Sequence, residues 1–369
     1  MDELVYKIGI SLIPGVGSVN AKKIIAYVGS IEGVFKEKER NLVKIPGIGQ
    51  YIAHSVAHHN VLGRAEKELA FISRHQVKPL FYLDKEYPER LKHCADAPVM
   101  LFVKGDIDFN LPKFVAIVGT RSATSYGKQF CETLIRELNE RNHKAIIVSG
   151  LAYGIDITAH KAALKYNMPT IAALGHGLST VYPSTHKSIA CEIVSQGALV
   201  SEFLHDEPAD KANFLKRNRI IAGLCDAVIV AESGEKGGSL VTADIANSYN
   251  REVFALPGLI NDPYSKGCNK LIKNNKAALI EGVSDLEYLL NWEVPGERKK
   301  IQAVQKSLFL EINDEEQLIL DAFSEEKALH IDQLCGLLQQ PVSKISPLLL
   351  NLEFSGLIKS LPGSLYQRI

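Results

Sequence analysis

The sequence predicts an α/β protein with a Rossmann-like, doubly wound and mostly parallel sheet, flanked by a small all-α domain and a C-terminal winged-helix domain. Between residues 114 and 290, short β-branched apolar runs alternate with helix-length stretches, the pattern of parallel strands buried on both faces. Residues 1–60 hold two copies of a glycine hairpin between helical patterns. Residues 311–369 show three helical patterns and a terminal hairpin around Gly356 and Gly363, which indicates a winged helix.

Composition shifts divide the chain into four segments. A stretch after Trp292 that includes Val294-Pro-Gly-Glu-Arg-Lys-Lys300 has the proline, glycine and charge content of a linker. Two strand-like runs, residues 79–83 and 99–103, precede the alternating region and are expected to extend its sheet. The predicted segments are a helical-hairpin domain at 1–65, an extended Rossmann-like domain at 66–291, a linker at 292–310 and the winged-helix domain at 311–369.

The whole-chain composition indicates a globular protein without an overall charge preference. Hydrophobic residues make up 46% of the chain, and 42 Lys and Arg residues balance 42 Asp and Glu residues. Polyanion binding would therefore have to come from local patches. The six cysteines form no Cys-x-x-Cys pair, so we expect reduced thiols without a metal or disulfide role. We recognise no signal peptide and no run of roughly 18 apolar residues, and so expect a cytoplasmic protein without a membrane partner.

The N-terminal repeat resembles a tandem helix-hairpin-helix, or SAM-like, motif. Ile13-Pro-Gly-Val-Gly17 with Ala21 returns 32 residues later as Ile45-Pro-Gly-Ile-Gly49 with Ala53. The glycines permit a tight turn with positive φ, after which the next helix presents its first amide groups. Such hairpins either hold a DNA phosphate without reading bases or serve only as packing units, and the sequence leaves both open. The secondary candidates for DNA contact are Gly15, Gly17, Lys22, Lys23, Gly47 and Gly49.

The predicted parallel strands end in small and polar residues, and ligands of doubly wound sheets bind outside those carboxyl ends. The ends carry Gly119-Thr120-Arg121, Ser149-Gly150, Gly175, Ser201-Glu202, Glu232-Ser233 and Pro257-Gly258. No Gly-x-Gly-x-x-Gly follows the first strand and no Walker lysine follows a glycine loop, so we expect no cofactor. A further glycine turn, with Gly238 and Ser239, opens a predicted helix and forms a candidate phosphate nest.

A basic cluster lies between two of these strand ends. Its four cations occupy nine residues without an acid among them, and they are Lys211, Lys216, Arg217 and Arg219. Arginine can hold a phosphate bidentately. Phe214, within the cluster, could either offer a face to a base or belong to the core. The cluster therefore indicates an anion site.

Asp156 and His160 lie one helical turn apart and could form a general acid–base pair. An aspartate near a helix start is more often a cap or dipole partner, and we favour that structural interpretation. We therefore predict no catalytic residue.

Several long motifs, in this order along the chain, resemble the DNA-processing protein A family (DprA/Smf). They are Ala116-Ile-Val-Gly-Thr-Arg121, Ser149-Gly-Leu-Ala-Tyr-Gly-Ile-Asp156, Arg217-Asn-Arg-Ile-Ile-Ala-Gly223, Gly238-Ser-Leu-Val-Thr-Ala243 and Leu256-Pro-Gly258. The resemblance covers nearly the whole chain, and both terminal domains match known variants of the family. It implies a bacterial protein that binds single-stranded DNA through the Rossmann-like domain, forms a homodimer, and helps load the RecA recombinase during natural transformation.

The resemblance also implies DNA contacts at matching positions. Arg121 matches the arginine of the first strand-end motif, and Lys211 and Phe214 match a lysine and an aromatic residue of the family's DNA pocket. Arg217-Asn218-Arg219 matches its Arg-Asn-Arg core, in which Asn218 could serve only to hold the loop. The DNA-binding candidates are Gly119, Thr120, Arg121, Ser149, Gly150, Lys211, Phe214, Lys216, Arg217, Asn218, Arg219, Gly238 and Ser239.

Two positions depart from the family pattern. Leu215 stands where members usually have proline, so the loop expected here loses a fixed φ. His176 occupies the middle of a turn that is Gly-Cys-Gly-like in the family, and we expect a neutral histidine at the surface. Neither change removes a basic contact.

The leading hypothesis is a non-enzymatic, sequence-independent binder of single-stranded DNA. The alternative is a nucleotide-processing, phosphoribohydrolase-like enzyme on the same fold, since such enzymes use a Pro-Gly-Gly-x-Gly-Thr-x-x-Glu loop. Here Leu240 replaces the third glycine and would block close approach of a phosphate, and Asp244 only loosely replaces the glutamate. A third hypothesis is a scaffold that binds double-stranded DNA or a partner protein through the terminal domains.

Overall fold

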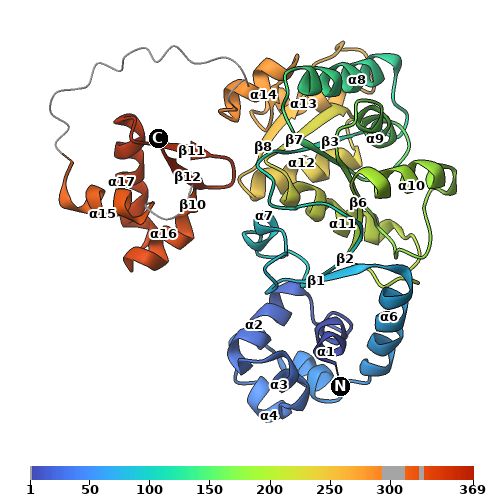
Figure 1. Cartoon of the computed structure of the whole chain (residues 1–369), viewed down its shortest axis with the longest axis vertical. Coiled ribbons are helices and arrows are strands. Elements are labelled where there is room, and N and C mark those ends of the chain that lie inside the picture. Colours follow the sequence, from blue (N-terminus) through green and yellow to red (C-terminus); the bar gives the residue numbers. More distant parts are fainter. Residues whose placement is uncertain (1, 293–311, 324–327) are drawn as a thin grey trace.

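The computed structural model describes residues 2–292, 312–323 and 328–369. They form a helical N-terminal domain, a central sheet with helices on both faces, and a small C-terminal domain (Figure 1). The linker predicted at 292–310 lies, apart from Trp292, outside the described residues. No helix in these described ranges is long and apolar enough to cross a membrane.

A nine-stranded sheet forms the centre of the protein, in the order β1-β2-β6-β5-β4-β3-β7-β8-β9. Its strands are β1 (Lys78–Phe81), β2 (Met100–Gly105), β3 (Phe114–Gly119), β4 (Ile146–Ser149), β5 (Thr170–Ala173), β6 (Ala198–Ser201), β7 (Ala227–Glu232), β8 (Glu252–Ala255) and β9 (Ala278–Leu279). All neighbouring strands in the run β6-β5-β4-β3-β7-β8-β9 are parallel. Strand β2 is antiparallel to β6, and β1 is antiparallel to β2. The predicted doubly wound sheet and its extension by the two preceding runs are confirmed. Strand β9 was not predicted, because two residues are too few to show a period.

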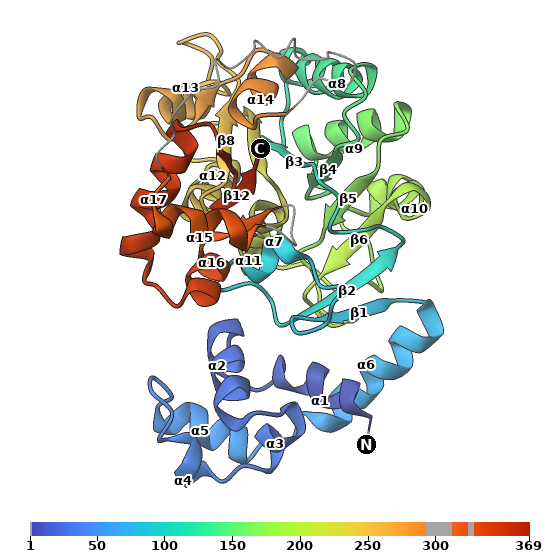
Figure 2. The same ribbon diagram turned by 60° about the vertical axis from the view of Figure 1, so that its left-hand side comes forward.

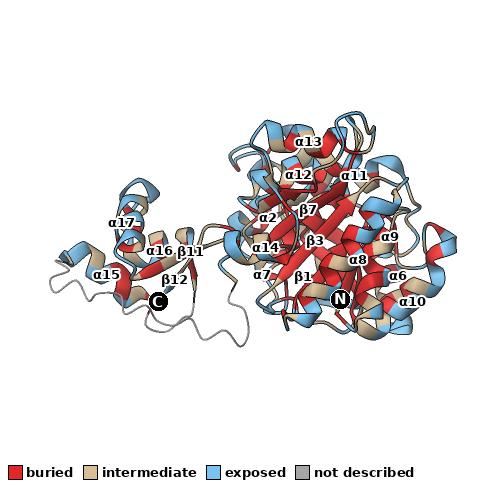
Figure 3. Ribbon diagram, turned by 90° about the horizontal axis from the view of Figure 1, so that it is seen from above, coloured by how far each residue is buried: buried red, intermediate tan, exposed pale blue. Residues whose placement is uncertain are grey.

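Helices cover both faces of the sheet because alternate strand residues point to opposite sides. Ala116 and Val118 of β3 belong to a core that includes residues of α7 (Glu89–Lys92), α11 (Lys211–Leu224), α12 (Gly238–Ser248) and α13 (Lys266–Lys273). Val115 and Ile117 belong to a second core, with residues of α8 (Ser125–Glu140), α9 (Ile155–Lys165) and α14 (Val283–Leu289). Figure 3 shows the strands buried between these two layers.

The direction of winding changes at β3, which is the switch point of the sheet. From β3 the chain moves outward through β4, β5 and β6, and it then returns to the other side of β3 to form β7. The loop after β3 leads to α8 on one face, and the loop after β7 leads to α12 on the other. Loops that diverge in this way leave a crevice at the carboxyl ends of the strands, which is where such sheets bind ligands.

Six helices form the N-terminal domain, which lies beside the β1–β2 end of the sheet (Figure 2). They are α1 (Glu3–Ile10), α2 (Ser18–Val28), α3 (Ile31–Lys36), α4 (Glu39–Leu42), α5 (Gln50–Ala57) and α6 (Leu62–His75). Gly15 and Gly47 have φ values of 76° and 81°, so the first glycine of each hairpin is the one that needs a left-handed backbone. A Cβ on Gly15 would lie 2.7 Å from the Tyr51 ring, and one on Gly47 would lie 2.8 Å from the Lys23 amine. Tyr51 of α5, the helix after the second hairpin, therefore covers the first hairpin. Lys23 of α2, the helix after the first hairpin, covers the second.

The C-terminal domain contains three helices and a three-stranded sheet. Its elements are α15 (Asp314–Ala322), β10 (Leu329–His330), α16 (Ile331–Leu338), α17 (Val342–Phe354), β11 (Ile358–Leu361) and β12 (Leu365–Arg368). Gly356 and Gly363 both have positive φ, the first after α17 and the second in the turn between β11 and β12. The predicted winged helix, with glycines at these two positions, is confirmed.

A largely buried ion pair joins the sheet to the segment that precedes it. Arg90 of α7 donates two hydrogen bonds to Asp226, from Nε at 2.7 Å and from Nη2 at 3.1 Å. Asp226, just before β7, also accepts the Phe114 amide at 2.8 Å. The guanidinium lies 4.5 Å from the centre of the Phe114 ring. This carboxylate therefore connects α7, β3 and β7.

We expect Asp226→Ala to lower the free energy of unfolding by about 3–5 kcal/mol, because it leaves the largely buried Arg90 charge uncompensated and the buried Phe114 amide without its acceptor. Urea unfolding followed by circular dichroism measures the change. Asp244→Ala is the matched control, since it breaks the exposed pair with Lys276 and should cost less than about 1 kcal/mol. Equal, small losses in both variants would contradict a structural role for the Asp226 network.

Candidate functional site

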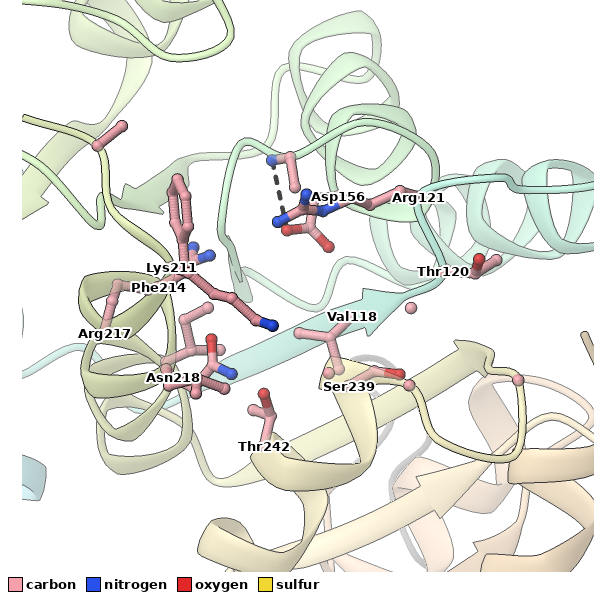
Figure 4. A pocket seen from close by; sticks show the side chains of 18 of the residues that line it. Val118, Thr120, Arg121, Asp156, Lys211, Phe214, Arg217, Asn218, Ser239 and Thr242 are labelled. Carbon is pink, nitrogen blue, oxygen red and sulfur yellow. Dashed lines mark hydrogen bonds between the residues drawn. The ribbon is translucent and has the colours of Figure 1, made fainter.

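A pocket of about 640 Å³ opens where the loops after β3 and β7 diverge. The carboxyl end of β3, the first turns of α11 and the start of α12 form its walls, with Lys211 and Phe214 on the α11 side and Ser239 and Thr242 on the α12 side (Figure 4). The predicted residues that line it are Gly119, Thr120, Arg121, Lys211, Phe214, Arg217, Asn218, Gly238 and Ser239. Ser149, Gly150, Lys216 and Arg219 do not line it. The structure thus brings residues from three separate motifs into one cavity.

The basic cluster is helical, and the expectation that it forms a loop was wrong. Residues Lys211–Leu224 form α11, and the side chain of the N-cap residue Asp210 accepts the Ala212 amide at 2.8 Å. Leu215 lies inside this helix, where a proline would remove a hydrogen-bonding amide. Its backbone is therefore held by helical hydrogen bonding, and the loss of proline does not loosen the site.

Helical geometry divides the cluster between two sides of α11. Lys211, Phe214 and Asn218 recur at intervals of three and four residues and so share one side, which faces the pocket. Arg219 lies outside the pocket and binds the Asp96 carbonyl and the Glu202 carboxylate. Lys216 is exposed, and its positive charge lies close enough to Glu202 to favour the ionised form of that carboxylate. DNA contact by Lys216 and Arg219 therefore stays a prediction, and Arg219 already has internal partners.

Arg217 is a buried cation beneath the pocket, with 5% of its surface exposed. Its Nη1 donates to the Ala173 carbonyl at 2.7 Å, and its buried Nε has no hydrogen-bond partner among the described residues. A Cβ on Gly150 would lie 1.8 Å from Nη1. Gly150, which we had predicted as a DNA contact, is thus the residue whose missing side chain makes room for Arg217.

A buried carboxylate lies near this guanidinium. Burial raises the pKa of Asp156, while the positive charge of Arg217 and hydrogen bonds oppose the rise. Burial in turn lowers the pKa of Arg217, and Asp156 raises it. The two charges stabilise each other in a site that neither would occupy alone.

The exposed part of the pocket is positive and partly aromatic. Arg121 is exposed, and its guanidinium lies 5.7 Å from the centre of the Phe214 ring. Tyr182 also lies beside Phe214, with 5.7 Å between the two ring centres. Phe214 packs against Gly175, where a Cβ would come within 2.6 Å of its ring. No ion pair engages Arg121 or Lys211 within the part of the chain that the structure describes.

The start of α12 supplies neutral donors to the same cavity. Gly238 is exposed at the first position of the helix, and Ser239 is buried with its hydroxyl 2.9 Å from that of Ser233. A Cβ on Gly237 would lie 2.2 Å from the Ser233 hydroxyl, so the turn needs glycine. The first amides of a helix have no helical acceptors and favour an anion.

Other singled-out residues have structural partners. Ser149 is buried and donates to the Ile117 carbonyl at 2.6 Å. Lys22 reaches the Cys94 and Ala95 carbonyls, each at 3.4 Å, and so contacts the central domain. Asp156 lies in the first turn of α9 and accepts the Ala152 amide at 3.4 Å. His160 bonds to Thr170, so the structure supports the structural interpretation of these two residues.

His176 is buried, and the expectation of a surface residue was wrong. Only 1% of it is exposed. Its Nδ1 donates to the Gly177 carbonyl at 2.9 Å, and its Nε2 accepts the Tyr182 amide at 3.2 Å. Burial lowers its pKa, in agreement with the neutral form that these bonds require. The histidine holds the turn that carries Tyr182 to the pocket.

Some pocket residues were not predicted. Thr242 lies one helical turn after Gly238, and this spacing could have indicated that it shares the pocket wall. Tyr182 comes from the loop between β5 and α10 (Lys187–Gln196), where no pattern marks it.

Glu39, His54 and His58 form a group with metal-binding potential outside the pocket. One ligand atom of each lies within 4.8 Å of the others, and both histidine side chains are largely exposed. Two imidazoles and a carboxylate suit a zinc-like ion. Glu39 lies on α4, His54 lies on α5 and His58 directly follows α5, so the group belongs to the N-terminal domain and does not contribute to the pocket.

We expect Gly150→Ala to lower the free energy of unfolding by about 1–3 kcal/mol, because its methyl group would displace the Arg217 guanidinium. Gly238→Ala is the control, since no atom lies within 4 Å of a Cβ there and the change should be neutral or slightly stabilising. Urea titration of both variants measures the difference. A Gly150→Ala protein as stable as the wild type would show that Arg217 is not confined as described.

Stability should fall in acid partly because of His160. Burial lowers the pKa of His160 to about 3, so the unfolded state binds this proton more readily. The contribution is fully present above about pH 6.5 and is lost as the pH falls toward 3. Between pH 7 and 4.5 the wild type should lose roughly 2 kcal/mol more unfolding free energy than His160→Gln.

Urea unfolding at both pH values provides the measurement, and the exposed His75→Gln variant is the control. An identical pH dependence in the wild type and His160→Gln would show that the buried histidine does not govern this loss.

Two family models match the chain. The one described as DNA recombination-mediator protein A covers residues 78–291, and the one described as DprA winged helix domain covers residues 310–364. The first spans the whole nine-stranded sheet, including all the residues that line the pocket.

Relatives and solved structures agree. Protein Smf of Escherichia coli is 38% identical over 291 residues, which cover 75% of this chain and 74% of that protein. Protein Smf of Synechocystis is 31% identical and covers 99% of both chains. The X-ray structure of DprA from Streptococcus pneumoniae matches 78% of this chain and 98% of its own, with a TM-score of 0.64 and 34% identity. DprA from Helicobacter pylori, whose single-stranded DNA binding mode has been described structurally, matches 59% and 97% with a TM-score of 0.53 and 34% identity. With the sheet, the pocket and the winged helix in place, this chain belongs to the DNA recombination-mediator protein A (DprA/Smf) family.

Proposed function

We propose that this protein binds single-stranded DNA in the pocket between β3, α11 and α12, without sequence preference. The observation that carries the proposal is an open cavity in which two cations without an ion-pair partner in the described chain, Arg121 and Lys211, flank an aromatic ring. A third cation, Arg217, lies beneath them. Against these three charges the pocket lining holds one acid, Asp156.

Each part of the site suits one part of a nucleotide strand. Arg121 and Lys211 are exposed and can reach phosphates, and the amides at the start of α12 can bind a further phosphate oxygen. Phe214 offers its ring to a base, which is worth roughly 1–3 kcal/mol per base and requires that the base be unstacked from its neighbours. The pocket offers a ring for stacking and backbone amides for phosphates, which favours a single strand and no particular sequence.

Relatives support this assignment. The Helicobacter pylori protein that shares the fold is described by its binding of single-stranded DNA. We extend the proposal to the finer functions that the family implies, which are loading of the RecA recombinase during natural transformation, formation of a homodimer through the Rossmann-like domain, and action in the cytoplasm. A sizing measurement should then give twice the monomer mass of 40.6 kDa. RecA should assemble faster on single strands when the protein is added.

The enzyme alternative has less support. Asp244, which loosely replaces the glutamate of the enzyme loop, is exposed, pairs with Lys276 and does not line the pocket. Leu240 packs against the core on the α11 and α12 face of the sheet and does not line the pocket either, so the expectation that it blocks a phosphate was wrong. Release of a base from nucleoside monophosphates by the purified protein would restore that alternative.

Lys211→Gln and Arg121→Gln should each weaken binding to a labelled oligothymidylate, because each removes a phosphate contact. The slope of log affinity against log salt should become shallower by about 0.7 in each variant. Fluorescence anisotropy at several salt concentrations measures both quantities. These two positions are sharper tests than Arg217 or Arg219, whose replacement would also break internal hydrogen bonds.

Lys78→Gln is the control, since Lys78 is exposed on β1 at the far edge of the sheet. Unchanged affinity and slope in the Lys211 and Arg121 variants, or stronger binding of double-stranded DNA by the wild type, would contradict the proposed site.

A further inference from the structure

A second groove, of about 920 Å³, lies between α8 and α9. Arg121 lines both this groove and the pocket at the switch point. The two helices lie next to each other (Figure 1) and begin just after the carboxyl ends of β3 and β4. The groove therefore starts at the edge of the sheet where the pocket opens and continues along the opposite face.

The lining follows helical periodicity on both sides. On α8 it takes residues three and four apart, from Ser125 through Lys128 to Glu132. On α9 it takes residues four apart, Ile157, Lys161 and Lys165. The groove thus runs along the seam of the two helices, and the eleven residues of α9 give it a length of about 17 Å. This is longer than a pocket for one small anion requires.

Basic side chains outnumber acids in the groove lining, with Arg121, Lys128, Lys161 and Lys165 against Glu132. Lys128 and Lys161 are exposed, and in the described ranges neither has a carboxylate within ion-pairing distance. Farther along, Lys165 binds Glu132 and lies 5.2 Å from the centre of the Tyr166 ring. The groove therefore carries three cations without an ion-pair partner in the described ranges, Arg121, Lys128 and Lys161, and one paired cation, Lys165.

An aromatic side chain stands at the junction. Tyr153, in the loop before α9, is 45% exposed and lines the groove. Its hydroxyl lies 3.2 Å from that of Thr185, and its ring meets His186 edge to face. These contacts hold the ring in place while nearly half of the residue remains open to solvent. The groove and the pocket thus share one combination of groups. Each is lined by a fixed aromatic ring and by cations without an ion-pair partner in the described ranges.

We propose that this groove is a second subsite for the same nucleic-acid strand, which passes from the pocket over Arg121 and along the α8–α9 seam. Lys128 and Lys161 hold its phosphates, and Tyr153 stacks on a base. The inference rests on the proposed function, because it takes the polyanion in the pocket to be single-stranded DNA. It adds a path for the strand and a length dependence that the pocket alone does not provide.

The test compares oligothymidylates of about 6 and about 20 nucleotides, one near the lower end and one above the upper end of the roughly 4–16 nucleotides that single-strand sites cover. With the wild type, the longer oligomer should bind more tightly and with a steeper salt slope. Lys128→Gln/Lys161→Gln should weaken binding of the longer oligomer roughly tenfold and reduce its salt slope by about 1.4, with little effect on the shorter one. Tyr153→Ala should weaken binding of the longer oligomer about fivefold.

The matched control is Lys67→Gln/Lys78→Gln, which removes two exposed lysines on α6 and β1. If the longer oligomer binds the Lys128/Lys161 variant as it binds the wild type while Lys211→Gln still weakens both oligomers, the groove is not a subsite but the pocket stands. Equal losses for both lengths, or equal losses in the control, would also overturn the subsite, because they indicate a general effect of charge. Failure of the wild type to bind either oligomer would overturn the pocket and the groove together.

Discussion

The architecture of the site depends on one buried charge, the Arg217 guanidinium. It lies under the switch point, donates to the Ala173 carbonyl at the end of β5, and occupies the space that Gly150 leaves at the end of β4. Asp156 at the start of α9 supplies the nearby negative charge. An isolated charge at such a depth would cost several kcal/mol. Because these groups come from three different elements, this cation fixes how α11 sits on the sheet.

The position of α11 in turn decides which cations are available for a ligand. Its pocket side carries Lys211 and Phe214, while Arg219 is used on another side to bind Glu202 and the Asp96 carbonyl. A cluster that is uniformly basic along the chain therefore has two physical roles. One part can bind an anion, and the other part holds the helix against the loop before β2 and the carboxyl end of β6.

Much of the fold could be predicted from the sequence, because parallel strands that are buried on both faces appear in it as short, uninterrupted runs of apolar, mostly β-branched residues. The winged helix was equally accessible from its terminal hairpin, and the glycines expected at turns have positive φ at Gly15, Gly47 and Gly363. Errors arose where a short motif was interpreted without its surroundings. Leu215 was placed in a loop although it lies in a helix. His176 was placed at the surface, because no local pattern shows that its turn folds under the loop that carries Tyr182.

The sequence by itself determined the secondary structure of the sheet, the family, and the residue types that a phosphate site requires. Only the tertiary structure decided which of these residues share a cavity and which neutralise one another. Arg121 and Phe214 are 93 residues apart, yet they lie 5.7 Å from each other because β3 and α11 meet at the switch point. Burial and ion pairing depend on neighbours that are distant in sequence. Whether a charged residue binds a ligand or stabilises the fold therefore depends on the partners that the tertiary structure places around it.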